Sequence, residues 1–219
     1  MKNTKFILLS VLCLFLTLGI ISCGEDTNDN DYQKDFIQFD DVTLTAGSSQ
    51  DLAKGKELSW KSDNEFVASI IEGKIVGKIV GKAKMVSSKG SFVVTVKGLY
   101  NDFNEPYIQF GHNRETVKYY VKNNDRLIRD EDTLLIYKGT EKTEYIIYHF
   151  NDNKLDGSYI ATLPVNKNNL ENWALERYLP MASLDNSFCM SSLNMKTIIR
   201  MSTVSIYGNE YNMLGFTQQ

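Results

Sequence analysis

Between about residues 35 and 98, apolar and polar residues alternate, most clearly in residues 42–46 and 92–96. Alternation with a period of two places successive side chains on opposite faces of a β-strand. Six glycines punctuate the stretch and supply turn signals: Gly47, Gly55, Gly73, Gly77, Gly81 and Gly90. No window has helical periodicity. This part of the chain therefore predicts an all-β sandwich, with hairpin turns at Glu72-Gly73 and Lys89-Gly90.

Four sequence features in this stretch occur in a fixed order. They are a tryptophan-containing run over residues 58–70, the hairpin 73–77, Gly81-Lys82-Ala83 and the closing strand 93–96. Together they resemble the bacterial immunoglobulin-like group 2 domain. The resemblance implies an Ig-like sandwich over residues 35–98. Residues 48–56 are short and charged where that family has a longer apolar strand, so we expect a frayed edge there.

Two features of this stretch have a structural and a functional reading. An inward tryptophan in a sandwich is usually part of the core, so we expect Trp60 to pack rather than to bind a ligand. The repeated Gly-Lys-Ile-Val sequence of residues 73–82 lacks Walker spacing and a following helix. It therefore predicts successive hairpin turns rather than a phosphate loop.

Composition changes after Gly98, because all three prolines and eleven of the twelve tyrosines lie beyond it. We therefore place a domain boundary there and assign residues 99–219 to an α+β domain. Helices are predicted over 113–121, capped by Asn113, and over 169–179, with Leu170, Trp173, Ala174 and Tyr178 on one face. Strands are predicted at 133–137, 144–150, 157–163, 188–193, 197–207 and 211–216.

A helix followed by three strands therefore occurs twice, which predicts tandem helix plus antiparallel three-strand units. The first unit, with its glycine before the helix and its hairpin around residues 148–155, is similar to SmpA/OmlA lipoproteins and to the β-lactamase-inhibitor-protein fold. Both families pack a helix on an antiparallel sheet. The whole layout resembles surface lipoproteins of the Bacteroidota.

The N-terminus has the pattern of a lipoprotein signal. Two lysines precede an apolar run over residues 6–21, which is shorter than the roughly 20 residues that span a bilayer. Ile20-Ile21-Ser22-Cys23 resembles the bacterial lipobox, which implies a signal peptide over residues 1–22 and acylation, including palmitate, at Cys23. The alternative is an ordinary signal peptide that is cleaved after Ser22 and leaves a free thiol.

An acidic, polar stretch follows the cysteine, and we interpret residues 23–34 as a solvated tether. It resembles the surface-export signal of Bacteroidota lipoproteins, and the alternative is a plain spacer. The expected location is the outer membrane, lipid-anchored, with the cell exterior and the periplasm both open.

Charge and cysteine content argue against a nucleic-acid-binding protein and against a fold stabilised by disulfides. The net charge of −3 falls to −5 once the two lysines of the signal are removed, and a nucleic-acid binder needs a basic stripe instead. Cys13 lies in the signal and Cys23 is acylated, so Cys189 stands alone and no intrachain disulfide is expected.

Catalytic, cofactor and metal sites usually require clustered histidines, cysteines and carboxylates. The two histidines, His112 and His149, are far apart, and His149 is expected at a solvent-facing strand position. Asp130-Glu131-Asp132 predicts a charged turn, and Cys189 a small buried apolar residue. We therefore expect no catalytic, cofactor or metal site.

Tyrosine is the one residue type in surplus. Tyr107, Tyr119, Tyr145 and Tyr148 are candidate ligand-contact residues, because tyrosine stacks on sugars and anchors protein partners. Tyr120, Tyr137 and Tyr159 belong to the same surplus. The alternative is sheet packing, since strands favour tyrosine.

The function that this sequence favours is a non-enzymatic lipoprotein that binds or adheres to a glycan or an envelope protein. The alternative is an envelope-assembly or enzyme-inhibitor lipoprotein of the helix-on-sheet type. A third reading, an enzyme using scattered carboxylates, requires a polar pocket with a strongly perturbed Asp or Glu.

Overall fold

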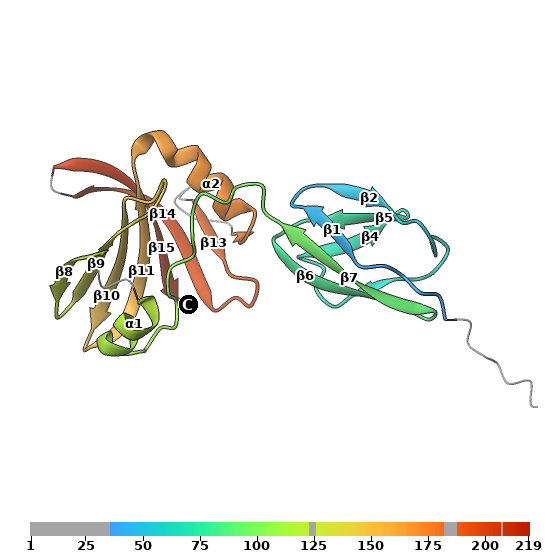
Figure 1. Cartoon of the computed structure of the whole chain (residues 1–219), viewed down its shortest axis with the longest axis horizontal. Coiled ribbons are helices and arrows are strands. Elements are labelled where there is room, and N and C mark those ends of the chain that lie inside the picture. Colours follow the sequence, from blue (N-terminus) through green and yellow to red (C-terminus); the bar gives the residue numbers. More distant parts are fainter. Residues whose placement is uncertain (1–35, 123–125, 182–187, 207) are drawn as a thin grey trace, which may run out of the picture. The chain divides into compact units, whose positions relative to one another are not determined.

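The computed structural model describes residues 36–122, 126–181, 188–206 and 208–219. The predicted signal peptide, Cys23 and the acidic tether lie outside the described residues. The described part of the chain is mostly β-sheet (Figure 1), as the alternating sequence pattern predicts.

Two sheets form the N-terminal part of the described chain. The first has the order β1-β7-β6-β3, with β1 (Val42–Thr45), β7 (Gly90–Lys97), β6 (Gly81–Ser87) and β3 (Lys61–Ser62). The second has the order β2-β5-β4, with β2 (Ser49–Asp51), β5 (Lys74–Gly77) and β4 (Ala68–Ile71). Strands β1 and β7 run parallel, and the other pairs are antiparallel.

One apolar core lies between these two sheets. It draws buried residues from both: Leu44, Leu52, Val67, Ala68, Ile75, Ala83, Met85, Phe92, Val94 and Val96. Trp60 is half-buried at the edge of this core and packs edge-on against Phe39 and Phe92, with ring centroids 4.9 and 5.2 Å away. Its indole nitrogen donates to the carbonyl of Gly55 at 2.9 Å. The predicted packing role of Trp60 is therefore confirmed.

The structure contains both predicted turns, one of them shifted by a residue, and the predicted weak edge strand. Glu72 and Gly73 both have positive φ, 50° and 72°, and join β4 to β5 as predicted. The other turn lies one residue earlier than predicted, because Gly90 already begins β7. Strand β2 is a fully exposed edge strand of three residues, which agrees with the expected weak edge.

A single eight-stranded antiparallel sheet forms the C-terminal part. Its order is β12-β13-β14-β15-β11-β10-β9-β8. The strands are β8 (Leu127–Glu131), β9 (Leu134–Lys138), β10 (Tyr145–Asn151), β11 (Lys154–Thr162), β12 (Leu179–Pro180), β13 (Cys189–Ser191), β14 (Thr197–Ile206) and β15 (Asn209–Gln218). The helices are α1 (Arg114–Val121), the 3-10 turn η2 (Pro164–Asn166) and α2 (Lys167–Leu175).

Both α-helices pack on the same face of this sheet. Val117 of α1 contacts a buried cluster that includes Leu135, Tyr148 and Leu155. Residues of α2 join a second cluster that includes Ile160, Ile199, Leu214 and Phe216. Because side chains alternate along a strand, three tyrosines that are out of phase with these clusters lie on the opposite face: Tyr145, Tyr159 and Tyr211.

Two predictions for this part are wrong. Four strands, not three, follow each α-helix, and both sets of strands join one sheet rather than two separate units. Asp130 and Glu131 belong to the extra strand β8, and the turn occupies only Asp132 and Thr133. Strand β8 is an edge strand whose residues are nearly all exposed. It therefore needs no apolar alternation, and its charges suit an unpaired edge.

Residues 99–112, which we call the strap, connect β7 to α1 without forming a strand. The strap begins where the backbone N–H groups of Leu99 and Tyr100 donate to the Glu176 carboxylate at 3.0–3.1 Å. It ends where Gly111 N–H donates to the carbonyl of Leu155 at 2.8 Å. In Figure 1 it runs from beside α2 to α1.

Candidate functional site

Local sequence fixes the direction in which α1 presents its side chains. The Asn113 side chain accepts from Thr116 N–H at 2.8 Å and so caps the helix as predicted. With the helix fixed in this way, Val117 is fully buried against the sheet. Tyr119 and Tyr120 follow on the outer side and are 68% and 56% exposed.

Four rings, from α1 and the end of the strap, gather on this surface. We call Tyr107, His112, Tyr119 and Tyr120 the aromatic platform. Tyr107 and Tyr120 stack with centroids 5.6 Å apart and planes 13° apart, and His112 stacks on Tyr120 at 6.5 Å. Tyr119 meets Tyr120 edge-on at 5.3 Å, and the Tyr107 hydroxyl is hydrogen-bonded to His112 Nδ1. Large rings in such contact at the surface offer flat apolar faces to a ligand.

A cavity of about 460 Å³ opens beside the platform, and we call it the platform cavity. Its aromatic lining comes from Tyr107, Tyr120, Tyr137 and Tyr148. Its charged lining comes from Glu105, Arg126 and Lys138. The Tyr137 hydroxyl is buried without a hydrogen-bond partner in the described part of the chain. The volume falls within the roughly 300–1,000 Å³ of small-molecule sites.

The tyrosines that support the platform are neutral phenols at ordinary pH. Burial raises the pKa of Tyr148 to about 12, and the hydrogen bond from the Tyr107 N–H, at 3.3 Å, opposes this shift. Burial and then the nearby Tyr120 raise the pKa of Tyr107. Each hydroxyl therefore keeps its proton and can serve as a hydrogen-bond donor.

A second cavity of about 460 Å³, the strap cavity, is lined partly by the same strap residues. Its lining from the strap and α2 region consists of Asn101, Phe103, Asn104, Glu105, Trp173, Arg177 and Tyr178. Asn104 and Glu105 line both cavities. The two cavities are therefore neighbours that share one short piece of the strap as a wall.

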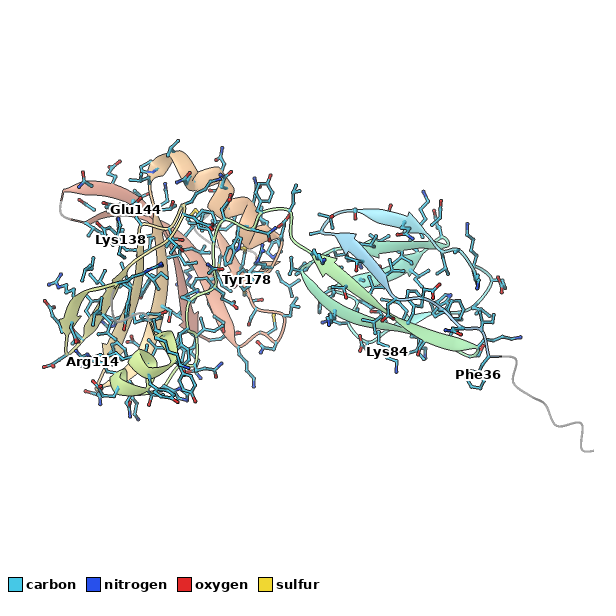
Figure 2. The ribbon with its side chains drawn as sticks, in the orientation of Figure 1. Phe36, Lys84, Arg114, Lys138, Glu144 and Tyr178 are labelled. Atoms are coloured by element: carbon cyan, nitrogen blue, oxygen red, sulfur yellow. The ribbon has the colours of Figure 1, made fainter. Side chains whose placement is uncertain are left out.

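Polar groups in the strap cavity are held in defined positions. The Tyr178 hydroxyl, on the side chain labelled in Figure 2, donates to the Glu105 carboxylate. Burial and then the Glu105 charge raise the pKa of Tyr178 far above its ordinary value. The Arg177 guanidinium lies 4.8 Å from the centre of the Trp173 ring and donates to the carbonyl of Trp173 at 3.0 Å.

One donor in this cavity is left over. The Trp173 indole N–H is buried, and no described residue accepts a hydrogen bond from it. Buried N–H groups are normally paired, so an orphan donor in a cavity wall points to a missing acceptor.

The four tyrosines predicted as ligand contacts separate into three groups. Tyr107 and Tyr119 belong to the platform, and Tyr148 lies beneath it, only 2% exposed. Tyr145 lies on the opposite sheet face, with the Lys138 ammonium 5.2 Å from its ring centre and Tyr211 in edge-on contact. The prediction missed Glu105 and Trp173, because neither stands in a recognisable sequence motif.

The residues considered for catalysis remain separate from one another. His149 is solvent-exposed, as predicted, with Nδ1 2.6 Å from the Asp156 carboxylate. Cys189 is a free, half-buried thiol, less buried than predicted. Within the described ranges, no three His, Cys, Asp or Glu residues lie together as a metal site would require. No helix among the described residues has both the length and the apolarity to cross a bilayer.

We compared the chain with protein families, curated proteins and solved structures. No family model, no curated protein and no solved structure matches this chain.

Proposed function

We propose that this protein is a lipid-anchored protein of the bacterial cell envelope that binds an envelope glycan or protein through its aromatic platform. Acylation of Cys23 anchors it in the outer membrane, and the acidic tether of residues 23–34 separates the anchor from the folded part. In this proposal the protein performs no catalysis and needs no cofactor.

The N-terminal sandwich serves as a spacer in this proposal. We infer an Ig-like module over residues 35–98, because two sheets enclose one core and the tryptophan, hairpin and closing-strand features occur in the order of the bacterial group 2 domains. Three of its aromatic residues, Trp60, Phe39 and Phe92, contact one another at the core and so serve packing. The remaining residues, 99–219, form the α+β recognition module.

The observation that carries the binding proposal is the aromatic platform itself. Leaving Tyr119 and Tyr120 more than half exposed forgoes the stabilisation that burial of large rings would bring. Exposed apolar patches are typical of interaction sites, and ligand pockets are commonly lined by aromatic side chains. A functional contact gives a reason for keeping these rings in solvent.

The anchor is tested by labelling cells that produce the full chain with radioactive palmitate and comparing it with Cys23→Ser. We expect label on the wild type and none on the variant. Protease treatment of intact cells then reports on the side of the membrane. Label that persists in Cys23→Ser would remove the proposed anchor.

Recognition is tested by capture from solubilised envelope fractions with the full chain in mild detergent. We expect an envelope component bound by the wild type and lost with the double variant Tyr119→Ala, Tyr120→Ala. Phe66→Ala is the matched control, because Phe66 is 55% exposed and lies in the N-terminal sandwich. Equal capture by all three proteins would contradict a role of the platform.

A second candidate, an envelope-assembly or enzyme-inhibitor lipoprotein, is favoured by the sheet face opposite the helices. On that face the Tyr159 ring lies over Gly157 and Gly215, where an added side chain would collide with it. Tyr145 and Tyr211 contact each other nearby. This candidate predicts that a secreted hydrolase or an assembly factor co-purifies with the wild type but not with Tyr145→Ala, Tyr159→Ala.

A further inference from the structure

Hydrogen-bonding groups with unused capacity surround the shared strap residues. Among the described residues, the Glu105 carboxylate accepts one hydrogen bond, from Tyr178, so most of its acceptor sites stay open. The Trp173 N–H donates to nothing described. Both residues line the strap cavity together with Asn104 and Arg177.

The hydrogen-bond donors and acceptors in the strap cavity indicate which class of ligand could bind there. Carboxylate oxygens accept, while the indole and guanidinium groups donate, and the Asn104 amide does both. A ligand must therefore present donors and acceptors side by side, which adjacent hydroxyl groups do because each O–H is both. An apolar ligand would leave the carboxylate and the indole N–H unpaired, which is unfavourable.

Charges around the strap favour a neutral ligand over an anion. Glu105 is the one acidic residue that lines either cavity among the described residues. Arg177 already has Glu176 at 3.4 Å and Asn101 at 3.3 Å. The strap cavity therefore offers no free cluster of cations for a phosphate or a polyanion. In the platform cavity the Lys138 ammonium already lies 2.7 Å from the Glu144 carboxylate, so Arg126 is the other cation of that lining and faces the Glu105 charge in the same cavity.

The aromatic platform supplies an apolar surface beside these polar groups. The nearly parallel rings of Tyr107 and Tyr120 line the platform cavity together with Glu105. One face of a sugar ring carries C–H bonds that pack on the electron-rich face of an aromatic ring. Its edge meanwhile carries hydroxyl groups that reach polar side chains. The stacking surface and the hydroxyl-binding groups thus line two neighbouring cavities that share Asn104 and Glu105.

We propose that the ligand of this site is a neutral oligosaccharide, with one sugar ring against the Tyr107–Tyr120 stack and the hydroxyl groups of an adjoining sugar held by Glu105, Asn104 and the Trp173 N–H. The assignment rests on the proposed binding function and names its ligand class. It also predicts binding without cleavage, because glycoside hydrolysis ordinarily needs a pair of carboxylates and the described lining supplies Glu105 alone.

The test is titration of the full chain in mild detergent with cellohexaose, maltohexaose and mannohexaose, and with a hexamer of galacturonic acid as the anionic comparison. Isothermal calorimetry measures affinity, and tryptophan fluorescence reports on Trp173. The Trp60→Phe variant removes the other tryptophan signal. We expect at least one neutral hexasaccharide to bind and to change Trp173 fluorescence while remaining uncleaved.

Variants locate the binding. Glu105→Gln keeps the shape but removes the charge, and Tyr120→Ala removes half of the stack, so each should weaken binding by about tenfold or more. Phe66→Ala should leave affinity unchanged. Thermal unfolding of every variant confirms that it is folded.

Three results overturn the assignment: no neutral hexasaccharide binds, binding is unchanged in both Glu105→Gln and Tyr120→Ala, or the galacturonate hexamer binds more tightly. If no sugar binds but an envelope protein is still captured in a manner that depends on Tyr120, the saccharide assignment falls and the proposed binding function stands. If nothing is captured and no sugar binds, both fall.

Discussion

Helices α1 and α2 cover the same face of one sheet, but they use their residues differently. Helix α2 buries Leu170, Trp173 and Ala174 in nine residues. Helix α1 buries only Val117 in eight residues and leaves two tyrosines in solvent. A helix of α1's kind adds little to the core. Its outer side chains are therefore free to serve recognition, whereas the buried side chains of α2 serve the core, apart from the Trp173 N–H that we assign to the ligand.

The largest effect should follow from shortening a buried side chain of α2. Leu170 is 0% exposed, so Leu170→Ala should lower the free energy of unfolding by about 2 to 5 kcal/mol. Urea unfolding followed by circular dichroism measures the loss. Tyr119→Ala on α1 should change the same quantity by less than about 0.5 kcal/mol, as for a surface site. Similar losses in both variants would mean that α1 contributes as much to the core as α2 does.

A smaller effect should appear at high pH through the residues under α1. An unfolded tyrosine ionises near pH 10, and burial raises the pKa of Tyr148 to about 12. The Tyr148 contribution is therefore complete below about pH 10 and is lost as the pH rises through 12, by roughly 2 to 3 kcal/mol.

Stability measured in urea between pH 9 and pH 11.5 tests this prediction. Tyr148→Phe should flatten the alkaline loss relative to the wild type. Tyr119→Phe, which changes an exposed tyrosine, should leave the slope as it is. A wild-type slope in Tyr148→Phe would mean that Tyr148 is not held in its neutral form by the fold.

The cap of α1 should matter less than the core of α2. Asn113→Ala removes the acceptor for Thr116 N–H and should cost about 1 kcal/mol, while Asn113→Gly should cost only a few tenths. Chemical unfolding distinguishes the two variants. If the alanine variant is as stable as the glycine variant, the side-chain cap does not fix the platform helix.

A small effect on stability, comparable with that of the α1 cap, and the sharpest separation from α2 are expected for Tyr120→Ala. It removes one exposed ring and its stack with Tyr107, an interaction of roughly 0.5 to 1.5 kcal/mol at most. Binding of the proposed ligand should nevertheless weaken by about tenfold or more. A variant that keeps binding and loses several kcal/mol would assign Tyr120 to the core instead.

The fold was predictable where sequence period reflects burial. The apolar spacing of Leu170, Trp173 and Ala174 predicted the buried face of α2, and Asn113 predicted the start of α1. Strand β8 was not predicted, because an exposed edge strand needs no alternation of apolar and polar residues. The single eight-stranded sheet was not predicted either. It depends on the pairing of β11 with β15, which are distant in sequence.

The candidate site was predictable only in part. Strand alternation separates Tyr145 from Tyr148, but sequence does not say which sheet face the helices cover. The contact between Glu105 and Tyr178 joins residues 73 positions apart and belongs to no motif. The strap that brings them together has no periodicity, so its path is set by tertiary contacts alone.

The strap is fixed at both ends and in its middle, where Ser158 Oγ donates to the carbonyl of Tyr107 at 2.6 Å. A segment ordered before its ligand arrives loses little conformational entropy on binding. The free site is thus pre-organised, and association should proceed without a slow rearrangement. A ligand should therefore associate and dissociate without waiting for the strap to fold around it.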